Sequence, residues 1–336
     1  MEDTREDRAR AGASLFERAL AAERLIREHV RETPLEHSPV LSERLGCETF
    51  LKLENFQETG SFKLRGVLSK LMSMDEAELG KGIVTASTGN HGLATAHAAR
   101  LLGLSAEIVV PEGARGFRLD KLIATGVTTS VHGTECAEAE SWARAEAERT
   151  GRVYVPPYSD IDVVAGQGTV AIELLRQCDS VDLLAATVGG GGLVAGVAGA
   201  LKDAGLATVA LGCLPEASPA MYESVLAGHV VRTEVLPTLS DSSAGNVEEG
   251  AITLELCGRY VDEWVLVPER GILDAMRLLC REHDMVVEGA AGVAVCGAMM
   301  AGPGLRLNRE SRAVVIICGG NVSPSVFADV LDCEGE

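Results

Sequence analysis

Aromatic residues are scarce in this sequence, since phenylalanine, tryptophan and tyrosine together make up 4% of its 336 residues. The core must therefore be built from Ala, Val, Leu and Ile. Positive charge is also in short supply, and the formal net charge is −19. A phosphate backbone would be repelled, and no basic stripe with interleaved aromatics occurs, which excludes nucleic acid as a partner. We interpret the acidity as a solubility feature of the surface.

Long apolar runs are missing too. No stretch of roughly twenty uncharged apolar residues is present, so we expect no membrane span and no membrane partner. Residues 1–5 are charged or polar apart from the initial methionine, and they lack the apolar core of a signal peptide. The sequence therefore predicts a cytoplasmic protein.

No Cys-x-x-Cys pair occurs among the nine cysteines, which are spread singly along the chain. This spacing does not meet the rule for structural zinc sites, so we expect no zinc ligation. In a reducing compartment these thiols are predicted to be mostly buried small hydrophobic residues. The positions are 47, 136, 178, 213, 257, 280, 296, 318 and 333.

The chain is long enough for two packed domains, and its 46% hydrophobic and 24% charged content is that of a globular protein. A helix is predicted over 14–32. Beyond it, apolar strands alternate with glycine or polar turns and helices, which predicts an α/β fold with parallel sheets covered on both faces. Ligands of such sheets bind beyond the carboxyl ends of the strands. The predicted strands are 48–53, 83–86, 106–110, 183–188, 209–214 and 313–317.

The first segment whose residues are suited to catalysis is Gly60-Ser61-Phe62-Lys63-Leu64-Arg65-Gly66. A lysine between Phe62 and Leu64 is expected to be partly desolvated, which lowers the pKa of its amine and makes it a nucleophile. Arg65 would push that pKa in the same direction if it lay nearby. The alternative is an ordinary surface lysine at the start of a helix.

The second segment, Ser87-Thr88-Gly89-Asn90-His91-Gly92, directly follows the strand predicted at 83–86. Small residues and a glycine at a helix N-terminus expose backbone N–H groups that suit a carboxylate. Asn90 offers a donor and an acceptor to a ring substituent. The same sequence also makes a good turn and helix cap.

The third segment is Gly189-Gly190-Gly191-Gly192-Leu193, between a strand and a helix. Its backbone can wrap a phosphate at a helix N-terminus. It is neither a nucleoside-triphosphate loop nor a dinucleotide fingerprint, because the required lysine and acidic residue are missing. The fourth segment ends the strand at 313–317 with Cys318-Gly319-Gly320-Asn321, where Cys318 alone would read as a buried core thiol.

Together, in this order, the four segments resemble the fold-type II pyridoxal-phosphate enzymes, specifically the threonine/serine dehydratase and serine racemase group. The resemblance runs from Thr33-Pro34-Leu35 to Asn321. It implies a tryptophan synthase β-like fold of two domains with pyridoxal 5′-phosphate between them. The large domain is expected at 1–78 with 160–336, and the small domain that closes over the substrate at 79–159.

The same resemblance assigns the site residues. Lys63 forms the Schiff base with the cofactor and Phe62 packs against it, Asn90 contacts the ring hydroxyl, and Cys318 faces the pyridine nitrogen. Gly189, Gly190, Gly191, Gly192 and Leu193 hold the phosphate. The substrate carboxylate is expected to lie against Ser87, Thr88, Gly89 and His91.

The implied reaction is removal of the β-hydroxyl from a 3-hydroxy amino acid such as threonine or serine, which yields a 2-keto acid and ammonia. Lys63 removes the α-proton, and the cofactor phosphate is a plausible donor to the leaving hydroxyl. A thiol partner for the pyridine nitrogen makes a weaker electron sink than a carboxylate, which suits β-elimination. One alternative is an amino acid racemase, in which a hydroxyl at Thr88 serves as a second acid/base. A non-catalytic cofactor-binding protein is the other.

The chain departs from the family pattern in several places. Leu214 and Ala220 stand where many relatives ligate a divalent cation, so no bound metal is expected. Asp241-Ser242 replaces the usual Asp-Gly, and the altered pocket also permits a bulkier or more polar substrate. No regulatory domain follows Asn321, from which we expect no allosteric inhibition. Family members are commonly dimers, so a homodimer is expected. Residues whose place in the pocket the sequence leaves open are Arg115, Tyr158, Ser242 and Asn246.

Overall fold

The structure is a computed structural model that describes residues 12–114 and 116–331. Its larger sheet has six strands in the order β1-β2-β10-β7-β8-β9. All neighbours are parallel except β1 and β2, which pair antiparallel. The strands are β1 (Leu35–His37), β2 (Glu48–Lys52), β7 (Leu183–Thr187), β8 (Val209–Pro215), β9 (Glu263–Val267) and β10 (Arg312–Ile316).

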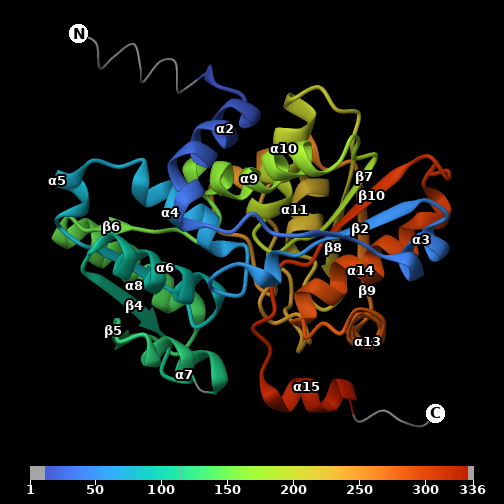
Figure 1. The fold of residues 1–336 in the computed structure, drawn as a ribbon. Helices are drawn as coiled ribbons and strands as arrows, with labels where there is room; N and C mark the ends of the chain where they lie inside the picture. Colours follow the sequence, from blue (N-terminus) through green and yellow to red (C-terminus); the bar gives the residue numbers. More distant parts are fainter. Residues whose placement is uncertain (1–11, 115, 332–336) are drawn as a thin grey trace.

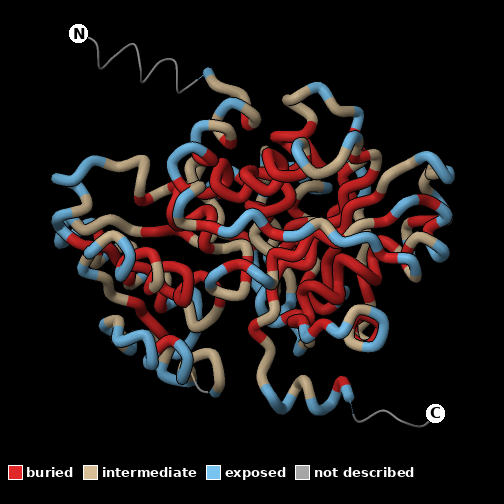
Figure 2. Tube along the Cα trace, in the orientation of Figure 1, coloured by how far each residue is buried: buried red, intermediate tan, exposed pale blue. Residues whose placement is uncertain are grey.

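Helices cover both faces of the larger sheet (Figure 1). On one side α10 packs on β7 and β8, with α9 and α2 beyond it, and on the other side α14 packs on the strands and α13 packs on α14. The buried segments gather around this sheet (Figure 2). The helices are α2 (Leu15–Ile26), α9 (Ile161–Gln177), α10 (Gly192–Asp203), α13 (Glu269–His283) and α14 (Gly289–Ala301).

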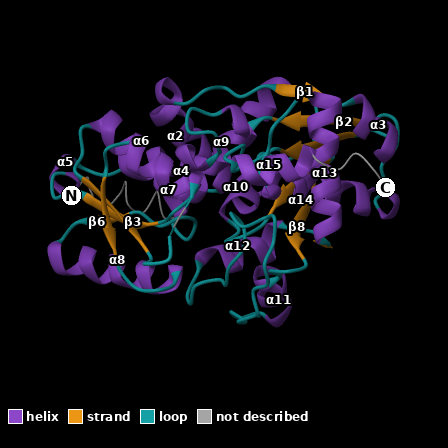
Figure 3. Ribbon diagram, turned by 90° about the horizontal axis from the view of Figure 1, so that it is seen from below, coloured by secondary structure: helices purple, strands orange, loops and turns teal. Residues whose placement is uncertain are grey.

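The smaller sheet has four parallel strands in the order β5-β4-β3-β6. Its strands are β3 (Ile83–Ala86), β4 (Ala106–Val110), β5 (Thr128–Val131) and β6 (Val153–Tyr154). Helices α6 (Asn90–Leu102) and α7 (Phe117–Ala124) lie on one face, and α8 (Cys136–Thr150) lies on the other. Figure 3 shows the two sheets as separate groups of strands.

Successive side chains of β3 and β4 point to opposite faces of the smaller sheet, as the period of a strand requires. Val84, Ala86 and Val109 pack against Ala139, Ala143 and Ala147 of α8. These three alanines are four residues apart and form one stripe of the helix. The stripe itself has no large side chains, and two of the chain's few aromatic residues, Trp142 and Tyr154, pack against the same cluster.

The remaining elements connect these layers. Helix α4 carries the Lys63 segment and packs between α9 and α6, and α15 lies apart, below α13 (Figure 1). The bounds are η1 (Arg27–His29), α3 (Pro39–Leu45), η2 (Glu54–Phe56), α4 (Lys63–Met72), α5 (Glu76–Leu79), α11 (Ala220–Ala227), α12 (Ile252–Tyr260), η3 (Gly302–Gly304) and α15 (Pro324–Leu331).

The predicted fold class is confirmed, since parallel sheets are flanked by helices on both faces. All six predicted strands form with small shifts of their ends. The helix predicted over 14–32 is shorter, because it begins after the capping Ser14 and passes into η1 at Arg27. The division at residues 79 and 159 stays a prediction. No helix in the described ranges is long and apolar enough to cross a membrane.

Candidate active site

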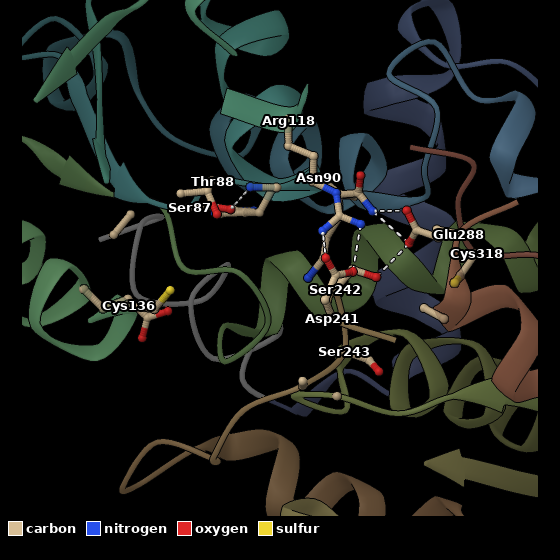
Figure 4. A pocket seen from close by; sticks show the side chains of 18 of the residues that line it. Ser87, Thr88, Asn90, Arg118, Cys136, Asp241, Ser242, Ser243, Glu288 and Cys318 are labelled. Carbon is tan, nitrogen blue, oxygen red and sulfur yellow. Dashed lines mark hydrogen bonds and ion pairs between the residues drawn. The ribbon is translucent and has the colours of Figure 1, made fainter. Parts of the chain in front are cut away.

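A pocket lies between the two sheets, at the carboxyl ends of β3, β4, β7 and β10 (Figure 4). This is the side on which parallel α/β sheets bind their ligands. It gathers parts of all four segments singled out in the sequence. The predicted site residues that line it are Phe62, Lys63, Ser87, Thr88, Gly89, Asn90, His91, Gly189 and Cys318.

Lys63 is the first residue of α4 and reaches into this pocket. Its Nζ donates a hydrogen bond to the carbonyl oxygen of Pro157 at 2.7 Å and lies 5.2 Å from the centre of the Phe62 ring. Burial lowers the pKa of the Lys63 amine to about 8, because the ammonium loses its hydration. The alternative of an ordinary surface lysine is therefore wrong.

Arg65 does not contribute to that lowered pKa, which corrects the expectation drawn from its proximity in sequence. Its guanidinium is fully buried and turned away into an ion-pair network. The Nε atom donates to Glu54 at 2.7 Å, and Nη1 donates to Glu173 at 2.8 Å. Lys52 completes the network by donating to Glu173 at 2.6 Å. Residues two apart in a helix point in different directions, so Arg65 fixes α4 to α9 while Lys63 faces the pocket.

The loop before Lys63 is joined to the end of β10. Ser61 and Gly319 form an antiparallel bridge. The backbone N–H of Phe62 donates to the carbonyl oxygen of Cys318 at 3.1 Å, and that of Gly320 donates to the carbonyl oxygen of Gly60 at 2.9 Å. Lys63 and Cys318 therefore belong to one hydrogen-bonded unit although 255 positions separate them.

Asn90, the first residue of α6, is buried and fully paired. Its Nδ2 donates to both carboxylate oxygens of Glu288, at 3.0 and 2.9 Å, and its Oδ1 accepts from Asn321 at 2.8 Å. Ser242 also donates to Glu288, at 2.9 Å (Figure 4). Glu288 is thus a pocket carboxylate that sequence reasoning missed. The available signal was an acidic residue directly before a glycine-rich apolar helix; Glu288 occupies the N-cap position of α14 without a side-chain capping hydrogen bond.

Ser87, Thr88 and Gly89 form the turn between β3 and α6, at the pocket wall. The Ser87 hydroxyl accepts a hydrogen bond from the Gly89 N–H at 3.1 Å. The first N–H groups of α6 have no partners within the helix, and the helix dipole favours negative charge at this end. The turn therefore offers donors to an anion.

His91 is anchored in the smaller sheet. Its Nε2 lies 3.0 Å from the Thr85 hydroxyl and 2.9 Å from the Val155 carbonyl oxygen. A carbonyl only accepts, so we assign the ring proton to Nε2. Burial, reinforced by the Lys63 charge, lowers the pKa of His91 to about 3, and the ring is neutral. The buried Nδ1 has no hydrogen-bond partner among the described residues.

The glycine loop joins β7 to α10. Gly191 caps the helix with φ of 83°, in the left-handed region that favours glycine. A Cβ at Gly190 would lie 2.3 Å from the Tyr158 ring, so the ring occupies the room that a side chain would need. Gly190, Gly191, Gly192 and Leu193 do not line the main pocket, whereas Gly189 does. The loop is closed on one side by Tyr158.

Cys318 follows β10 and is 3% exposed. Burial, and next the neighbouring Glu288 carboxylate, raise the pKa of the Cys318 thiol well above its usual value. It is therefore a neutral thiol, able to act as a weak donor. Five of the eight described cysteines are buried, as expected, whereas Cys136 is exposed; Cys333 lies outside the described residues.

The positions matched to the family's metal site hold no ligand cluster. Leu214 is buried in β8 and Ala220 begins α11. Within the described ranges, no group of three or more His, Cys, Asp or Glu side chains is arranged to hold a metal ion. Of the residues whose place was left open, Ser242 lines the pocket and Tyr158 borders the glycine loop, whereas Asn246 bonds Thr233 elsewhere. Arg115 lies outside the described residues.

Two further charged residues of the pocket escaped the sequence reasoning. Arg118 of α7 forms two hydrogen bonds with Asp241, at 2.6 and 2.9 Å, across the pocket mouth (Figure 4). Glu140 of α8 lines the pocket as well. Arg118 lies in the first turn of α7 and Glu140 lies in the first half of α8, and nothing in a single sequence distinguishes such pocket residues from solvated ones.

Comparison with known proteins agrees with this geometry. The profile of the family described as pyridoxal-phosphate dependent enzymes matches residues 26–319. The chain belongs to that family. It is therefore a pyridoxal-phosphate-dependent enzyme by descent, and the expected cofactor is confirmed at the level of the family.

Two curated relatives match most of the chain. An L-threonine ammonia-lyase of Thermotoga maritima is 36% identical over 93% of this chain and 76% of its own length. A β-hydroxyaspartate dehydratase of Paracoccus denitrificans is 33% identical over 91% of this chain and 96% of its own length.

Two solved structures share the fold. Threonine deaminase isoform 2 of Solanum lycopersicum aligns with a TM-score of 0.88 and 32% identity, covering 96% of this chain and 87% of the other. Maize serine racemase aligns with a TM-score of 0.86 and 28% identity, covering 94% and 96%.

Proposed function

We propose that this enzyme is an ammonia-lyase that removes the β-hydroxyl of a 3-hydroxy amino acid such as threonine or serine, giving a 2-keto acid and ammonia. The observation that carries the proposal is the desolvated Lys63 amine inside a pocket that also holds the Cys318 thiol and the N-terminus of α6. The ammonia-lyase and deaminase relatives support the same reaction class.

The residues present fit pyridoxal phosphate. The buried amine of Lys63 suits attachment of the cofactor aldehyde. The side-chain-free glycine loop at the start of α10 suits the phosphate. When bound, the cofactor supplies an electron sink that makes the α-proton of an amino acid acidic.

The protein groups then have distinct roles. When the cofactor is bound, Phe62 would pack against it, Asn90 would meet the ring hydroxyl, and Cys318 would face the pyridine nitrogen. The loop from Gly189 to Leu193 would hold the phosphate. Asn90 is held in place by Glu288 and Asn321, so its amide is oriented before any ligand arrives.

The substrate carboxylate lies at the turn formed by Ser87, Thr88 and Gly89, whose N–H groups start α6. His91 supports that turn from behind, because its Nε2 is bound to the sheet. Lys63, which lines the same pocket, would take up the α-proton of the substrate. Its low pKa keeps an appreciable fraction of the amine neutral and basic near neutral pH.

A racemase is the competing activity, and Thr88 is the residue that decides between them. Racemisation needs a second acid/base on the opposite face of the α-carbon, whereas elimination needs Lys63 as the only base at the α-carbon and a proton donor for the leaving hydroxyl. A cofactor-binding protein without catalysis is a weaker candidate, since it has no use for a desolvated lysine in the pocket.

The deciding experiment is a visible spectrum of the purified protein with a panel of 3-hydroxy amino acids, with keto acid and ammonia assayed. We expect a cofactor band that shifts and both products from at least one substrate, and loss of the band in Lys63→Ala. A shift without products favours the racemase. A spectrum with no cofactor band, even after cofactor is added, contradicts the role of Lys63.

Three further expectations belong to this proposal. The segment 79–159 forms a small domain that closes over the substrate, the enzyme acts as a homodimer, and it resides in the cytoplasm. Sedimentation velocity of the holoenzyme checks the dimer, for which a single species at twice the chain mass is expected.

A further inference from the structure

Among the residues that the structure describes, five charged side chains line the pocket, and four of them have partners. Arg118 and Asp241 pair with each other, and the Lys63 ammonium donates to the Pro157 carbonyl. Glu288 accepts hydrogen bonds from Asn90 and Ser242. The fifth is Glu140, which makes no hydrogen bond or ion pair with any residue that the structure describes.

Glu140 is held in the pocket wall by its helix. Its neighbour Ala139 belongs to the alanine stripe that packs α8 on the smaller sheet. Cys136, one turn earlier, lines the same pocket. Glu140 therefore lies at the pocket wall because the alanine stripe fixes the rotation of α8.

Arg144 is a cation near Glu140, but its guanidinium pairs with another carboxylate. Arg144, one turn later on α8, pairs with Glu248 and lies over the Tyr154 ring, 4.3 Å from its centre. Burial, and next the Glu248 charge, raise the pKa of the Glu140 carboxyl, and these effects outweigh the opposing charges of Arg144 and Lys63. Glu140 is a partly desolvated carboxyl with an unmet need for a cation.

Lys63 is the other cation that acts on Glu140, and it cannot serve as a permanent partner. Under the proposed function its amine is committed to the cofactor. Among the described residues, the loaded pocket is therefore left with an unpaired carboxyl on the α8 wall, while Arg118 stays bound to Asp241 at the mouth.

We propose that Glu140 selects a 3-hydroxy amino acid whose side chain ends in an ammonium group. The inference rests on the proposed function and names its substrate class. An ammonium on the substrate supplies the missing countercharge, and charge complementarity within a desolvated pocket gives specificity. A second carboxylate on the substrate meets repulsion from Glu140 instead, which sets this chain apart from its β-hydroxyaspartate dehydratase relative.

The kinetic test compares three substrates on the holoenzyme. They are threonine, 2,4-diamino-3-hydroxybutanoate, which is threonine with an ammonium on its γ-carbon, and 3-hydroxyaspartate. We expect the highest kcat/KM for the diamino substrate. Glu140→Gln should lower that value about tenfold or more and remove the preference for the diamino substrate over threonine. Glu148→Gln is the matched control, because Glu148 is an exposed carboxylate two turns further along α8.

A binding test decides the inference even if no substrate is dehydrated. The dissociation constants of 2,4-diaminobutanoate, 2-aminobutanoate and aspartate are measured from the visible absorbance of the bound cofactor. The diamino ligand should bind tightest to the wild-type holoenzyme, and Glu140→Gln should remove that preference. Equal affinities, or a preference for aspartate, overturn the role of Glu140. Absence of keto acid from every substrate, with the diamino preference intact, overturns only the proposed reaction.

Discussion

Lys63 shows how one buried position controls the chemistry of a side chain. Its amine loses hydration, gains one backbone acceptor in Pro157 and titrates near pH 8. The carboxylates of Glu288 and Glu140 raise that pKa, but less than burial lowers it. The residue is therefore a usable nucleophile at a pH where an exposed lysine is almost fully protonated.

The first prediction concerns cofactor uptake. Because only the neutral amine attacks an aldehyde, the rate at which apoenzyme gains visible absorbance after cofactor addition should rise with pH and level off above about 8. Below that pH the rate should fall about tenfold per pH unit. Stopped-flow absorbance between pH 6 and 10 measures it. A rate that still rises at pH 10 means that Lys63 titrates like an exposed lysine.

The second prediction concerns Thr88, in the turn beside Lys63. If Lys63 alone removes the α-proton, Thr88→Ala should keep elimination of the preferred enantiomer within about tenfold and abolish any racemisation. Chiral chromatography of the recovered amino acid and the keto acid yield give both values. Collapse of both activities with the cofactor band retained would mean that Thr88 is needed for elimination itself.

At the scale of elements, the site is assembled from strand ends and helix beginnings. The loop after β7 has to pass Tyr158, which lies where a side chain at Gly190 would project. Gly190→Ala should therefore displace the loop or the ring and weaken the apparent cofactor affinity about tenfold or more. Gly258→Ala, in α12, is the matched control, because its added Cβ meets only an ordinary contact at 3.9 Å. Titration of apoenzyme with cofactor measures both; equal affinities would show that the loop tolerates a side chain.

The fourth prediction concerns the ion pairs between α4 and α9 and their contribution to the free energy of unfolding. Arg65→Met leaves Glu54 and Glu173 buried without the guanidinium, which should cost about 3–5 kcal/mol of unfolding free energy at pH 7. Arg176→Met removes a half-exposed arginine and should cost under about 1 kcal/mol. Urea unfolding of the apoenzyme measures both. Similar losses of unfolding free energy in the two variants would contradict the claim that the buried ion pairs of Arg65 matter more than the exposed ones of Arg176.

The same network gives the sign of a pH effect. The neighbouring Arg65 and Lys52 hold the pKa of Glu173 at about 2, below its usual 4.5. Because the pKa of Glu173 is lower in the folded state, its ionised carboxylate stabilises the fold above pH 4.5. This contribution to the free energy of unfolding is lost as the pH falls toward 2. The stability gap between wild type and Arg65→Met should therefore narrow between pH 4.5 and 2.

Across the whole molecule, helices α7 and α8 reach from the smaller sheet to loops of the larger one. Arg118 pairs with Asp241, Lys121 donates to Asn321 at 2.8 Å, and Arg144 pairs with Glu248. These contacts join α7 and α8 to loops of the larger sheet, so they favour the closed arrangement proposed for substrate binding. They also predict that closure is weakened by salt, which screens exposed ion pairs.

The fifth prediction tests this link. Arg144→Met should raise KM about two- to fivefold by lowering the closed population, with kcat changed by less than about twofold. Arg149→Met is the control, because its partner Glu146 lies on the same helix. Steady-state kinetics with the preferred substrate measures both. An unchanged KM for Arg144→Met would show that this ion pair does not hold the two parts together.

Six strands and the four loops could be predicted because they are local patterns. Val314 to Ile317 is apolar on both faces, and the glycines and Lys63 lie at fixed positions between strand and helix. Strands β1, β5, β6 and β9 escaped prediction because they are mostly exposed or half-buried and so lack a continuous apolar run. The direction of Arg65 and the environments of Glu140 and Glu288 could not be predicted, because tertiary packing between distant segments decides them.

The place of β10 also determines when the site comes into being. β10 lies between β2 and β7, and it is the last strand of the described chain. The loop that carries Lys63 is joined to the residues directly after β10. A nascent chain that stops before residue 312 therefore has the lysine and the glycine loop but no central strand to bring them together. The cofactor should therefore bind only after the last strand has been synthesised. Prematurely terminated chains should lack the visible absorbance of the bound cofactor.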